Sequence, residues 1–445
     1  MKRSVLFAAL AVVLAAPFAV CGEDAPDSVL REVGLSDAWR LSLTVFAEFG
    51  DNRDSVPDHY SENVEERYRY KKEDDIKYGI QPTISYANRF SDVHSYKLSY
   101  SPIYHYWTNP RAGKDRSEFS HLAYAEYKWA PDARNQFILR DNFKYILNDR
   151  WTLDEEAVDR TPITDSKHVE HEQEHYDNTV HVGWRHQLSS RLNFDLDGFW
   201  NTIRYNDDEL SETSDEDKLG ATFRLNRVTS AQFQYGFYFR FLSWDDEDTV
   251  WTSQDGRYKT EKVERGIQTY TIGLSGTYRW DERLSFNASY GWEWVDYESG
   301  SIDDRDFPGD LTLSAVYALT LRTRGIFGVR YYVSEAWVYP YASQDLVSLY
   351  VTLRHAFTAR LSGSARAEYK MGEYDLKYVP EEARNETFVK KHEGDKNDIY
   401  VELALNYRYS QAFNINLAYG YEDVDSDVSN SFHENTIRVR ATYIF

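Results

Sequence analysis

Apolar and polar side chains alternate with a period of two along most of this chain. The alternation is clear over residues 191–202, 283–294, 360–371, 399–409 and 413–422. A two-residue period puts successive side chains on opposite faces of an extended strand, so it predicts β-strands with one apolar and one polar face. In the second of these segments the apolar positions are Leu284, Phe286, Ala288, Tyr290, Trp292 and Trp294.

The connections between these segments are of two kinds, which alternate along the chain. Eight are short and lie near residues 91, 131, 189, 229, 281, 323, 358 and 410. Nine are long and mostly acidic, over residues 51–75, 108–117, 149–175, 206–216, 245–265, 298–309, 340–344, 377–397 and 425–434. The connections therefore join eighteen strands, which we expect to begin near residues 38, 76, 93, 117, 134, 176, 191, 217, 231, 267, 283, 310, 325, 345, 360, 398, 412 and 435.

Short links on one side and long loops on the other are typical of transmembrane β-barrels. A soluble β-sandwich also alternates, but it does not require this asymmetry. The sequence predicts an all-β fold: a closed antiparallel transmembrane β-barrel of about eighteen strands, with short periplasmic turns and long acidic extracellular loops. Sixteen strands also fit the pattern. Pro82 and Pro102 fall inside two predicted strands, where they predict bulges or strand ends because proline cannot donate a ladder hydrogen bond.

The composition agrees with a barrel rather than with membrane helices. The mean hydropathy is −0.67, and no stretch after the N-terminus is apolar for eighteen residues. Aromatic residues reach 16%, with 36 Tyr and 12 Trp, and these residues favour strands and membrane interfaces. The formal charge of −22 disfavours nucleic acid as a partner.

The N-terminus has the pattern of a secretory signal peptide. Two basic residues precede an apolar run over residues 5–20, and small residues follow it. We expect residues 1–22 to be the signal peptide, 23–37 a short periplasmic segment and 38–445 an outer-membrane β-barrel. Cys21 is the only cysteine, so the exported chain would have no disulfide; acylation of Cys21 is the alternative.

The C-terminal segment resembles the signal that the barrel assembly machinery reads in outer-membrane proteins. The final residue is aromatic, and apolar residues occupy alternate positions before it. The residues that match are Ile437, Val439, Ala441, Tyr443 and Phe445.

Residues 76–148 carry a resemblance to a known family. They run from GIQPTISY at 79–86 and RFSD at 89–92 to a Tyr-rich strand at 96–107, and then to HLAYAEY at 121–127. This pattern, which extends over most of the chain, resembles the putative β-barrel porins of a second porin-like family (beta-barrel porin 2). The resemblance implies a channel for passive passage or export of small or anionic solutes, with polysaccharide export systems as one setting and source of partners. It implies no catalytic residues.

Charged residues alternate with the apolar positions and should therefore face the interior. The basic ones predicted to line the lumen and set selectivity are Arg140, Lys144, Arg185, Arg224, Arg240, Arg279, Arg330, Arg354, Arg366, Arg408, Arg438 and Arg440, with Lys370 beside them. The inward acids are fewer: Glu48, Asp195, Asp197, Glu293, Glu368, Glu402 and Glu422. Rings of Arg and Lys favour anions in pores. The competing interpretation is that these charges pair with one another and only stiffen the wall.

Two sets of aromatic residues follow from the same alternation. Trp residues near strand ends predict girdles at the membrane interfaces, namely Trp129, Trp184, Trp200, Trp244, Trp280, Trp292 and Trp294. Inward Tyr residues could instead stack on sugars, namely Tyr238, Tyr332, Tyr350 and Tyr400.

Two other patterns bear on chemistry. Residues 171–175 read HEQEH, which matches a zinc-protease motif, but the polar flanks predict a loop rather than the helix which that chemistry requires. Acidic clusters at 245–248, 303–306 and 423–427 suit hard cations such as Ca²⁺, but a charge run of this kind is usually a solvated loop. We therefore expect no enzyme, cofactor or metal site. Outer-membrane lipid, lipopolysaccharide and the assembly machinery are the expected partners. The alternatives are a structural or adhesive barrel with a plugged lumen, and a membrane-embedded hydrolase that uses Glu172.

Overall fold

The structure is a computed structural model that describes residues 38–52, 74–109, 117–147, 174–205, 215–254, 257–297, 305–335, 343–375, 395–426 and 431–445. The described residues form eighteen β-strands in one sheet. The strands are β1 (Trp39–Gly50), β2 (Asp75–Arg89), β3 (His94–Trp107), β4 (Ser117–Trp129), β5 (Asn135–Leu147), β6 (Glu174–Ser189), β7 (Leu192–Tyr205), β8 (Glu216–Val228), β9 (Phe233–Gln254), β10 (Arg257–Arg279), β11 (Leu284–Tyr297), β12 (Arg305–Thr320), β13 (Thr323–Glu335), β14 (Ser343–Ala356), β15 (Leu361–Asp375), β16 (Asp395–Arg408), β17 (Phe413–Ser426) and β18 (Phe432–Ile444). The predicted signal peptide (1–22) and periplasmic segment (23–37) lie outside these residues.

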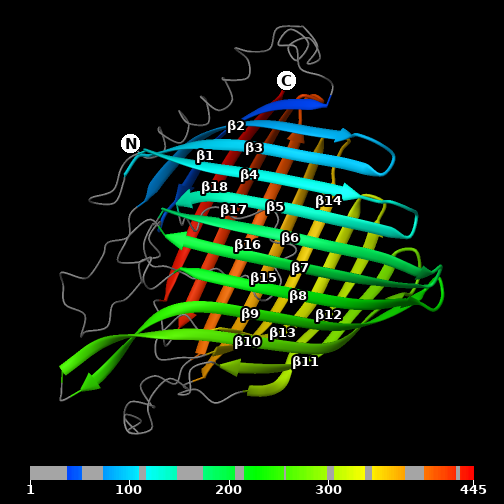
Figure 1. The fold of residues 1–445 in the computed structure, drawn as a ribbon. Coiled ribbons are helices and arrows are strands. Elements are labelled where there is room, and N and C mark those ends of the chain that lie inside the picture. The colour runs from blue at the N-terminus through cyan, green and yellow to red at the C-terminus, as the bar shows by residue number, and fades with distance from the viewer. Residues whose placement is uncertain are drawn as a thin grey trace.

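The sheet is closed. Each strand pairs antiparallel with its neighbours in sequence, and β1 pairs with both β2 and β18. The seam between the first and last strands aligns Ser42 with Ile444 and Gly50 with Thr436. Figure 1 shows the strands tilted side by side around a single barrel. Closure leaves no unpaired edge, which is what a β-structure needs inside a lipid bilayer.

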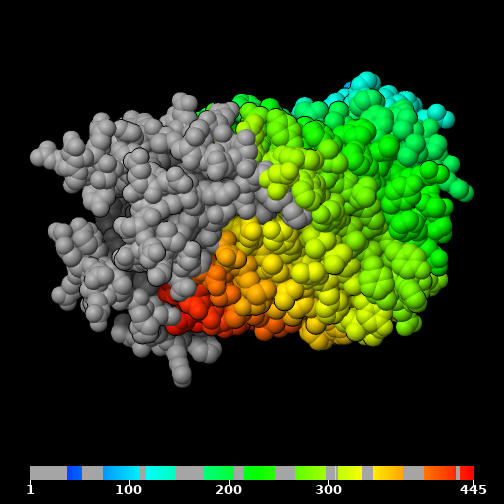
Figure 2. Space-filling model, turned by 90° about the horizontal axis from the view of Figure 1, so that it is seen from below, coloured from blue at the N-terminus to red at the C-terminus, as the bar shows by residue number. Residues whose placement is uncertain are grey.

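The outer face of the barrel is apolar and the inner face is polar. On β11, the outward side chains of Phe286, Tyr290 and Trp292 are exposed, whereas the inward Glu293 is buried. Figure 2 shows one side of the outer surface, where successive strands from the green to the orange part of the chain follow one another around the wall. A closed sheet with an apolar outer band is the form in which strands cross the outer membrane. The chain is therefore an outer-membrane β-barrel of eighteen strands, as predicted.

Among the described residues, no helix is long and apolar enough to cross a bilayer.

The eight predicted short turns are confirmed. Most residues of the predicted long loops lie outside the described part of the chain, and one predicted loop is corrected. The segment 245–265 was predicted to be a loop, but it continues β9 and β10, which are 22 and 23 residues long. The two strands stay paired to Gln254 and Arg257, so the hairpin extends beyond the rest of the barrel (Figure 1). The acidic run Asp245–Asp248 belongs to this hairpin. Because the acidic residues hid the strand pattern, the sequence placed the start of β10 near 267 instead of Arg257.

A side-chain oxygen caps each of the eight short turns, which define the turn end of the barrel. Asp281, for example, accepts hydrogen bonds from the backbone N–H groups of Arg283 and Leu284 at 2.7 Å each. The capping residues are Ser91, Asp132, Ser189, Ser230, Asp281, Thr320, Thr358 and Ser410. Short polar side chains of this kind fix tight turns by replacing a backbone partner.

Hydrogen bonds at one cap also change its acidity. Asp132 accepts from the side-chain amide of Asn135 and from the backbone N–H groups of Arg134 and Asn135. These bonds, with that of the Asn135 side chain the largest, hold the pKa of the Asp132 carboxyl below its usual value. The cap at this turn therefore stays ionised at neutral pH.

Removing the hydroxyl caps should weaken the barrel additively. We expect Ser230→Ala, Thr358→Ala and Ser410→Ala each to lower the free energy of unfolding by about 0.5–1 kcal/mol, since each removes hydrogen bonds to turn N–H groups. Urea titration of the folded protein in detergent measures the effect. Ser410→Thr keeps the hydroxyl and is the matched control. Equal loss in Ser410→Ala and Ser410→Thr would contradict the capping role.

The two strand prolines interrupt one ladder without ending a strand. The pairing of β2 with β3 is continuous up to Ile80–Tyr104 and resumes at Ile84–Tyr100. Pro82 and Pro102 lie in the gap, on the two facing strands, because neither can donate a backbone hydrogen bond. On the inner face, the hydroxyls of Thr83 and Ser101 are 2.7 Å apart across the same gap. The predicted disturbance is therefore real, but it takes the form of a gap in pairing.

Candidate functional site

The inner wall of the barrel is the candidate site, and the strand registers place all twelve predicted basic residues on it. They alternate with outward residues whose exposure marks the lipid face; Arg354, for example, lies next to the outward Leu353 on β14. The placed residues are Arg140, Lys144, Arg185, Arg224, Arg240, Arg279, Arg330, Arg354, Arg366, Arg408, Arg438 and Arg440. Carboxylates on the same wall neutralise some of these charges.

Among the described residues, six members of this set pair with a carboxylate at 4 Å or less. Three pairs are as close as 2.8–2.9 Å: Arg140 with Glu126, Arg240 with Asp310 and Arg366 with Glu368. Three are looser: Arg185 with Asp195 at 3.2 Å, Arg440 with Glu48 at 3.6 Å and Arg438 with Glu402 at 3.8 Å. These six charges pair with carboxylates of the wall, as the competing interpretation requires.

A buried ion-pair network lies at the seam between β18, β1 and β2. The Lys77 ammonium is 3.0 Å from Glu48 Oε2, and the two side chains are only 0% and 4% exposed. Arg440 approaches the other oxygen of Glu48. Lys77 also lies over the ring of Trp107, 5.1 Å from its centroid. One carboxylate therefore holds cations from both strands that flank β1.

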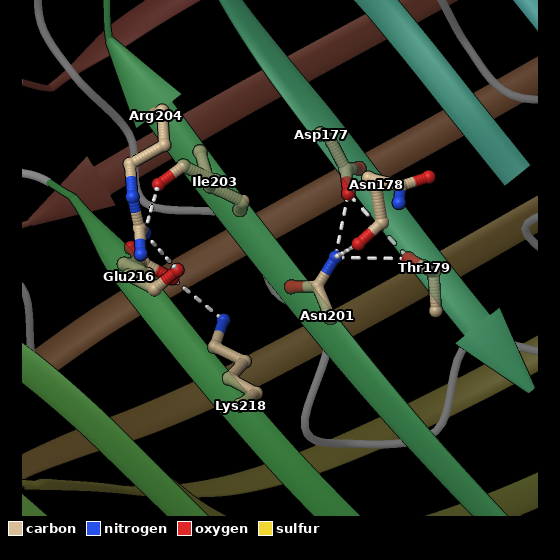
Figure 3. A network of polar contacts seen from close by, with 8 residues as sticks. All are labelled: Asp177, Asn178, Thr179, Asn201, Ile203, Arg204, Glu216 and Lys218. Atoms are coloured by element: carbon tan, nitrogen blue, oxygen red, sulfur yellow. Dashed lines mark hydrogen bonds and ion pairs between the residues drawn. The ribbon is translucent and has the colours of Figure 1, made fainter.

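Polar contacts are equally dense on β6, β7 and β8 towards the loop end (Figure 3). The Asn201 amide donates to Asp177 Oδ1 at 2.5 Å and to Thr179 Oγ1 at 2.9 Å. Lys218 lies 2.8 Å from Glu216, and its ammonium is 4.0 Å from the centre of the Trp244 ring. Charges in this part of the wall are matched by neighbouring groups.

The turn end of the inner wall differs, because five of its arginines have no carboxylate partner among the described residues. They lie within the five strand residues nearest the turns, and all are exposed. Four belong to the predicted set, and Arg324 joins them: Arg224, Arg279, Arg324, Arg354 and Arg408. The predicted excess of positive charge is thus concentrated at the end that faces the periplasm in barrels of this type.

Arg324 was missed because the sequence placed it in a turn. In the structure it is the second residue of β13 and lies directly opposite Arg354 on β14. Like charges that face each other across two strands destabilise a sheet. Nothing in the described wall offsets this repulsion, so the pair is a local concentration of positive potential that an anion would relieve.

The inward tyrosines lie where they were predicted, but two of them cannot stack on a sugar. Tyr238 and Tyr332 are 7% and 5% exposed. Tyr238 lies flat over Gly273, where an added Cβ would come within 2.1 Å of the ring, and its hydroxyl reaches Asp310. Tyr350 covers Gly328 in the same way. These rings complete the wall and do not project into the lumen.

One of the predicted girdle tryptophans faces inward. Trp244 is 5% exposed and packs beneath Lys218 on the inner face. The sequence missed this because Trp244 precedes an acidic run, so it looked like the end of a strand. The exposed ones keep the predicted outward position: Trp129, Trp200, Trp280, Trp292 and Trp294. Trp184 also faces outward, between the rings of Phe137 and Phe194.

The C-terminal residues have the predicted shared face. Ile437, Val439, Ala441 and Tyr443 alternate on the outer side of β18, next to β1 and β17. The Phe445 N–H donates to the Leu41 carbonyl at 2.9 Å, and the Phe445 ring meets Tyr443 edge-on at 4.9 Å. The final aromatic residue therefore lies at the turn end of the closing seam.

Replacing the terminal aromatic residue should impair insertion more than folding. We expect Phe445→Ala to reduce the amount of folded barrel in the outer membrane several-fold, while refolding of the purified chain in detergent changes little, because the backbone bond to Leu41 remains. Heat-modifiable migration on gels measures both. Phe445→Tyr is the conservative control. An equal loss in vitro would assign Phe445 a structural role instead.

The motifs considered for metal chemistry form no site in the described part of the chain. Residues 171–173 of the HEQEH segment lie outside it, and Glu174 and His175 begin strand β6 rather than a helix. Asp423 and Asp425 belong to β17. Among the described residues, no three His, Cys, Asp or Glu side chains come together to hold a metal ion.

Comparison with known proteins supports the fold alone. No family model matches the chain, and no curated protein matches it. Among solved structures, a mutant of the Pseudomonas aeruginosa ferric enterobactin receptor PfeA is 9% identical, with a TM-score of 0.50, over 92% of this chain and 81% of the receptor. P. aeruginosa OccK7 (9%, TM-score 0.48) and Acinetobacter baumannii OccAB4 (11%, TM-score 0.47) each match over 92% of this chain and 98% of theirs.

Proposed function

We propose that this outer-membrane barrel is a channel for small anionic solutes. The observation that carries the proposal is the set of five exposed arginines at the turn end of the inner wall, which have no carboxylate partner among the described residues. Positive residues that line a water-filled passage lower the energy of an anion and raise that of a cation. Towards the loop end, ion pairs such as Lys77–Glu48 and Lys218–Glu216 reduce the net charge of the wall.

Anionic sugars are the solute class that we propose. The five arginines offer charge-assisted hydrogen bonds to carboxylates, and the guanidinium fork of Arg suits a carboxylate particularly well. The resemblance to the second porin-like family, which rests on sequence pattern, agrees with passage or export of acidic polysaccharide fragments. In this proposal the chain has no catalytic step. Lipid and lipopolysaccharide surround its outer face, the assembly machinery inserts it, and an export system is a candidate partner.

Liposome swelling tests the proposal. Vesicles that contain the folded protein should swell several-fold faster in galacturonate than in galactose, which has a similar size and no charge. Glucosamine, a cation of the same size, should be slowest. Equal rates for the three sugars would contradict selectivity for anions. No swelling by protein that is folded would overturn the channel and favour a plugged structural barrel.

A further inference from the structure

The outer face of β3–β6 differs from the rest of the lipid face. Asp141 is the central outward residue of β5, and the outward residues on either side of it, Leu139 and Phe143, are exposed apolar side chains. In the register, Asp141 lies next to Val180, and the same row continues to Trp200 on β7. An ionisable group therefore interrupts a row of apolar residues that contacts the membrane.

Asn178 lies beside this carboxyl group. It faces outward from β6, and in Figure 3 its amide points away from Asn201. In the amide orientation that satisfies both of its polar atoms, Asn178 donates to Asp141 Oδ1 at 2.8 Å and to the Asn142 carbonyl at 3.0 Å. One amide cannot saturate a carboxylate, so Asp141 keeps acceptor capacity towards the outside.

A candidate donor for the Asp141 carboxylate lies on the neighbouring strand β4, on the same outer face. His121 of β4 contacts the Tyr100 hydroxyl through Nδ1 at 2.9 Å, and its ring stacks on Tyr100 and Phe119. In the tautomer in which Nδ1 accepts from the Tyr100 hydroxyl, the other nitrogen, Nε2, carries the hydrogen, and it has no hydrogen-bond partner among the described residues. Ala123 and Ala125 lie on β4 between the donor and the acceptor. Because their side chains are short, another protein surface could approach the strand closely there.

Lipid chains do not suit this surface, because they offer no hydrogen bonds. A charged residue on the lipid face of a barrel costs up to a few kcal/mol, although Asp costs less than Arg or Lys. Small residues with a few polar ones among them are the composition of protein–protein contacts inside membranes. The face carries both an acceptor and a donor, so it is complementary to itself.

We propose that the outer face of β3–β6 packs against the same face of a second copy of this chain in a twofold dimer. In such an interface, Asp141 of each copy accepts from His121 of the other, because a twofold axis exchanges the two contacts. Ala123 and Ala125 lie near the axis and let the two walls approach closely. The proposal does not depend on the barrel being a channel.

Disulfide cross-linking in intact outer membranes tests the dimer. Ala125→Cys should give a cross-linked dimer on oxidation, because a residue near a twofold axis meets its own copy. The matched control is Leu349→Cys on β14, an exposed lipid-facing residue nine strands from β5 in the eighteen-strand sheet, which should give none. Oxidation of the parent chain, whose only cysteine is Cys21, shows how much cross-linking arises without the introduced cysteine. If Ala125→Cys stays uncross-linked in folded protein, the proposal is overturned.

Native mass measurement in mild detergent tests the chemistry of the contact. The parent should have the mass of a dimer, and Asp141→Leu should raise the dissociation constant at least tenfold while the barrel stays heat-modifiable and therefore folded. His121→Phe keeps the stacked ring, removes the donor and should have a similar effect. A monomeric parent, a trimer without the Ala125 cross-link, or a monomer that carries only lipopolysaccharide would each overturn the proposal.

Discussion

Replacing Arg224, Arg354 and Arg408 together by Glu should reverse the ion selectivity of the barrel. Each of these arginines is exposed on the inner wall, and none has a carboxylate partner among the described residues. A charge about 10 Å from a passing ion in about 0.1 M salt contributes a few tenths of a kcal/mol, so the three sign changes should lower the chloride-to-potassium permeability ratio about fivefold. The zero-current potential in a salt gradient measures it.

The chain offers a matched control for this experiment on the same strand. Arg227 lies three residues from Arg224 on β8 and faces outward instead of inward. Arg227→Glu should leave the zero-current potential unchanged. Arg224→Glu alone should shift this potential in the same direction as the triple variant, but by a smaller amount. Arg366→Glu is a less clear probe, because Arg366 forms an ion pair with Glu368. Its replacement would both change the charge at position 366 and leave Glu368 without its partner. Equal effects of Arg224→Glu and Arg227→Glu would contradict a role of the inner wall.

Removing Glu48 should cause the largest loss of stability. Its carboxylate is nearly buried between Lys77 and Arg440 at the seam that closes the barrel. Breaking a buried ion pair by deleting one partner costs about 3–5 kcal/mol, because the remaining charge is left without compensation. We expect Glu48→Ala to lose about this amount in urea unfolding, and Glu48→Ala with Lys77→Ala to recover part of it.

A surface pair provides the comparison. Arg89 and Asp92 are 3.6 Å apart at a turn, and both side chains are exposed. Arg89→Ala should not change stability measurably, because exposed ion pairs contribute little. If Glu48→Ala is also without effect, the seam does not depend on its buried network. If the double variant is no more stable than Glu48→Ala, the loss comes from packing rather than from the orphaned cation.

The alternation of side chains made most of the architecture predictable. A two-residue period is a local property, and so are the Ser, Thr and Asp caps of the turns. Both made the strand count predictable. The exception is the β9–β10 hairpin, where acidic residues continue the strands beyond the apolar belt. A strand outside the membrane needs no apolar face, so its sequence lacks the signal that identified the others.

The inner face was predictable, but the balance of its charges was not. Alternation placed Arg240 and Arg366 inward correctly, yet only the three-dimensional structure shows that the partner of Arg240 is Asp310, on β12 rather than on an adjacent strand. Lys77 also follows the alternation, between the outward Ile76 and Tyr78, and it was overlooked because the segment before it is polar. Arg324 was missed because the turn that was predicted to include it begins two residues earlier in the structure.

Single-channel recording of the unmodified protein tests most directly whether this barrel is an anion channel. The folded protein is added to a planar bilayer with a potassium chloride gradient across it. An inner wall with unpaired arginines predicts steady open steps. It also predicts a zero-current potential that is shifted from zero towards the equilibrium potential of chloride. A silent bilayer from heat-modifiable protein, or open steps that favour potassium, would contradict it.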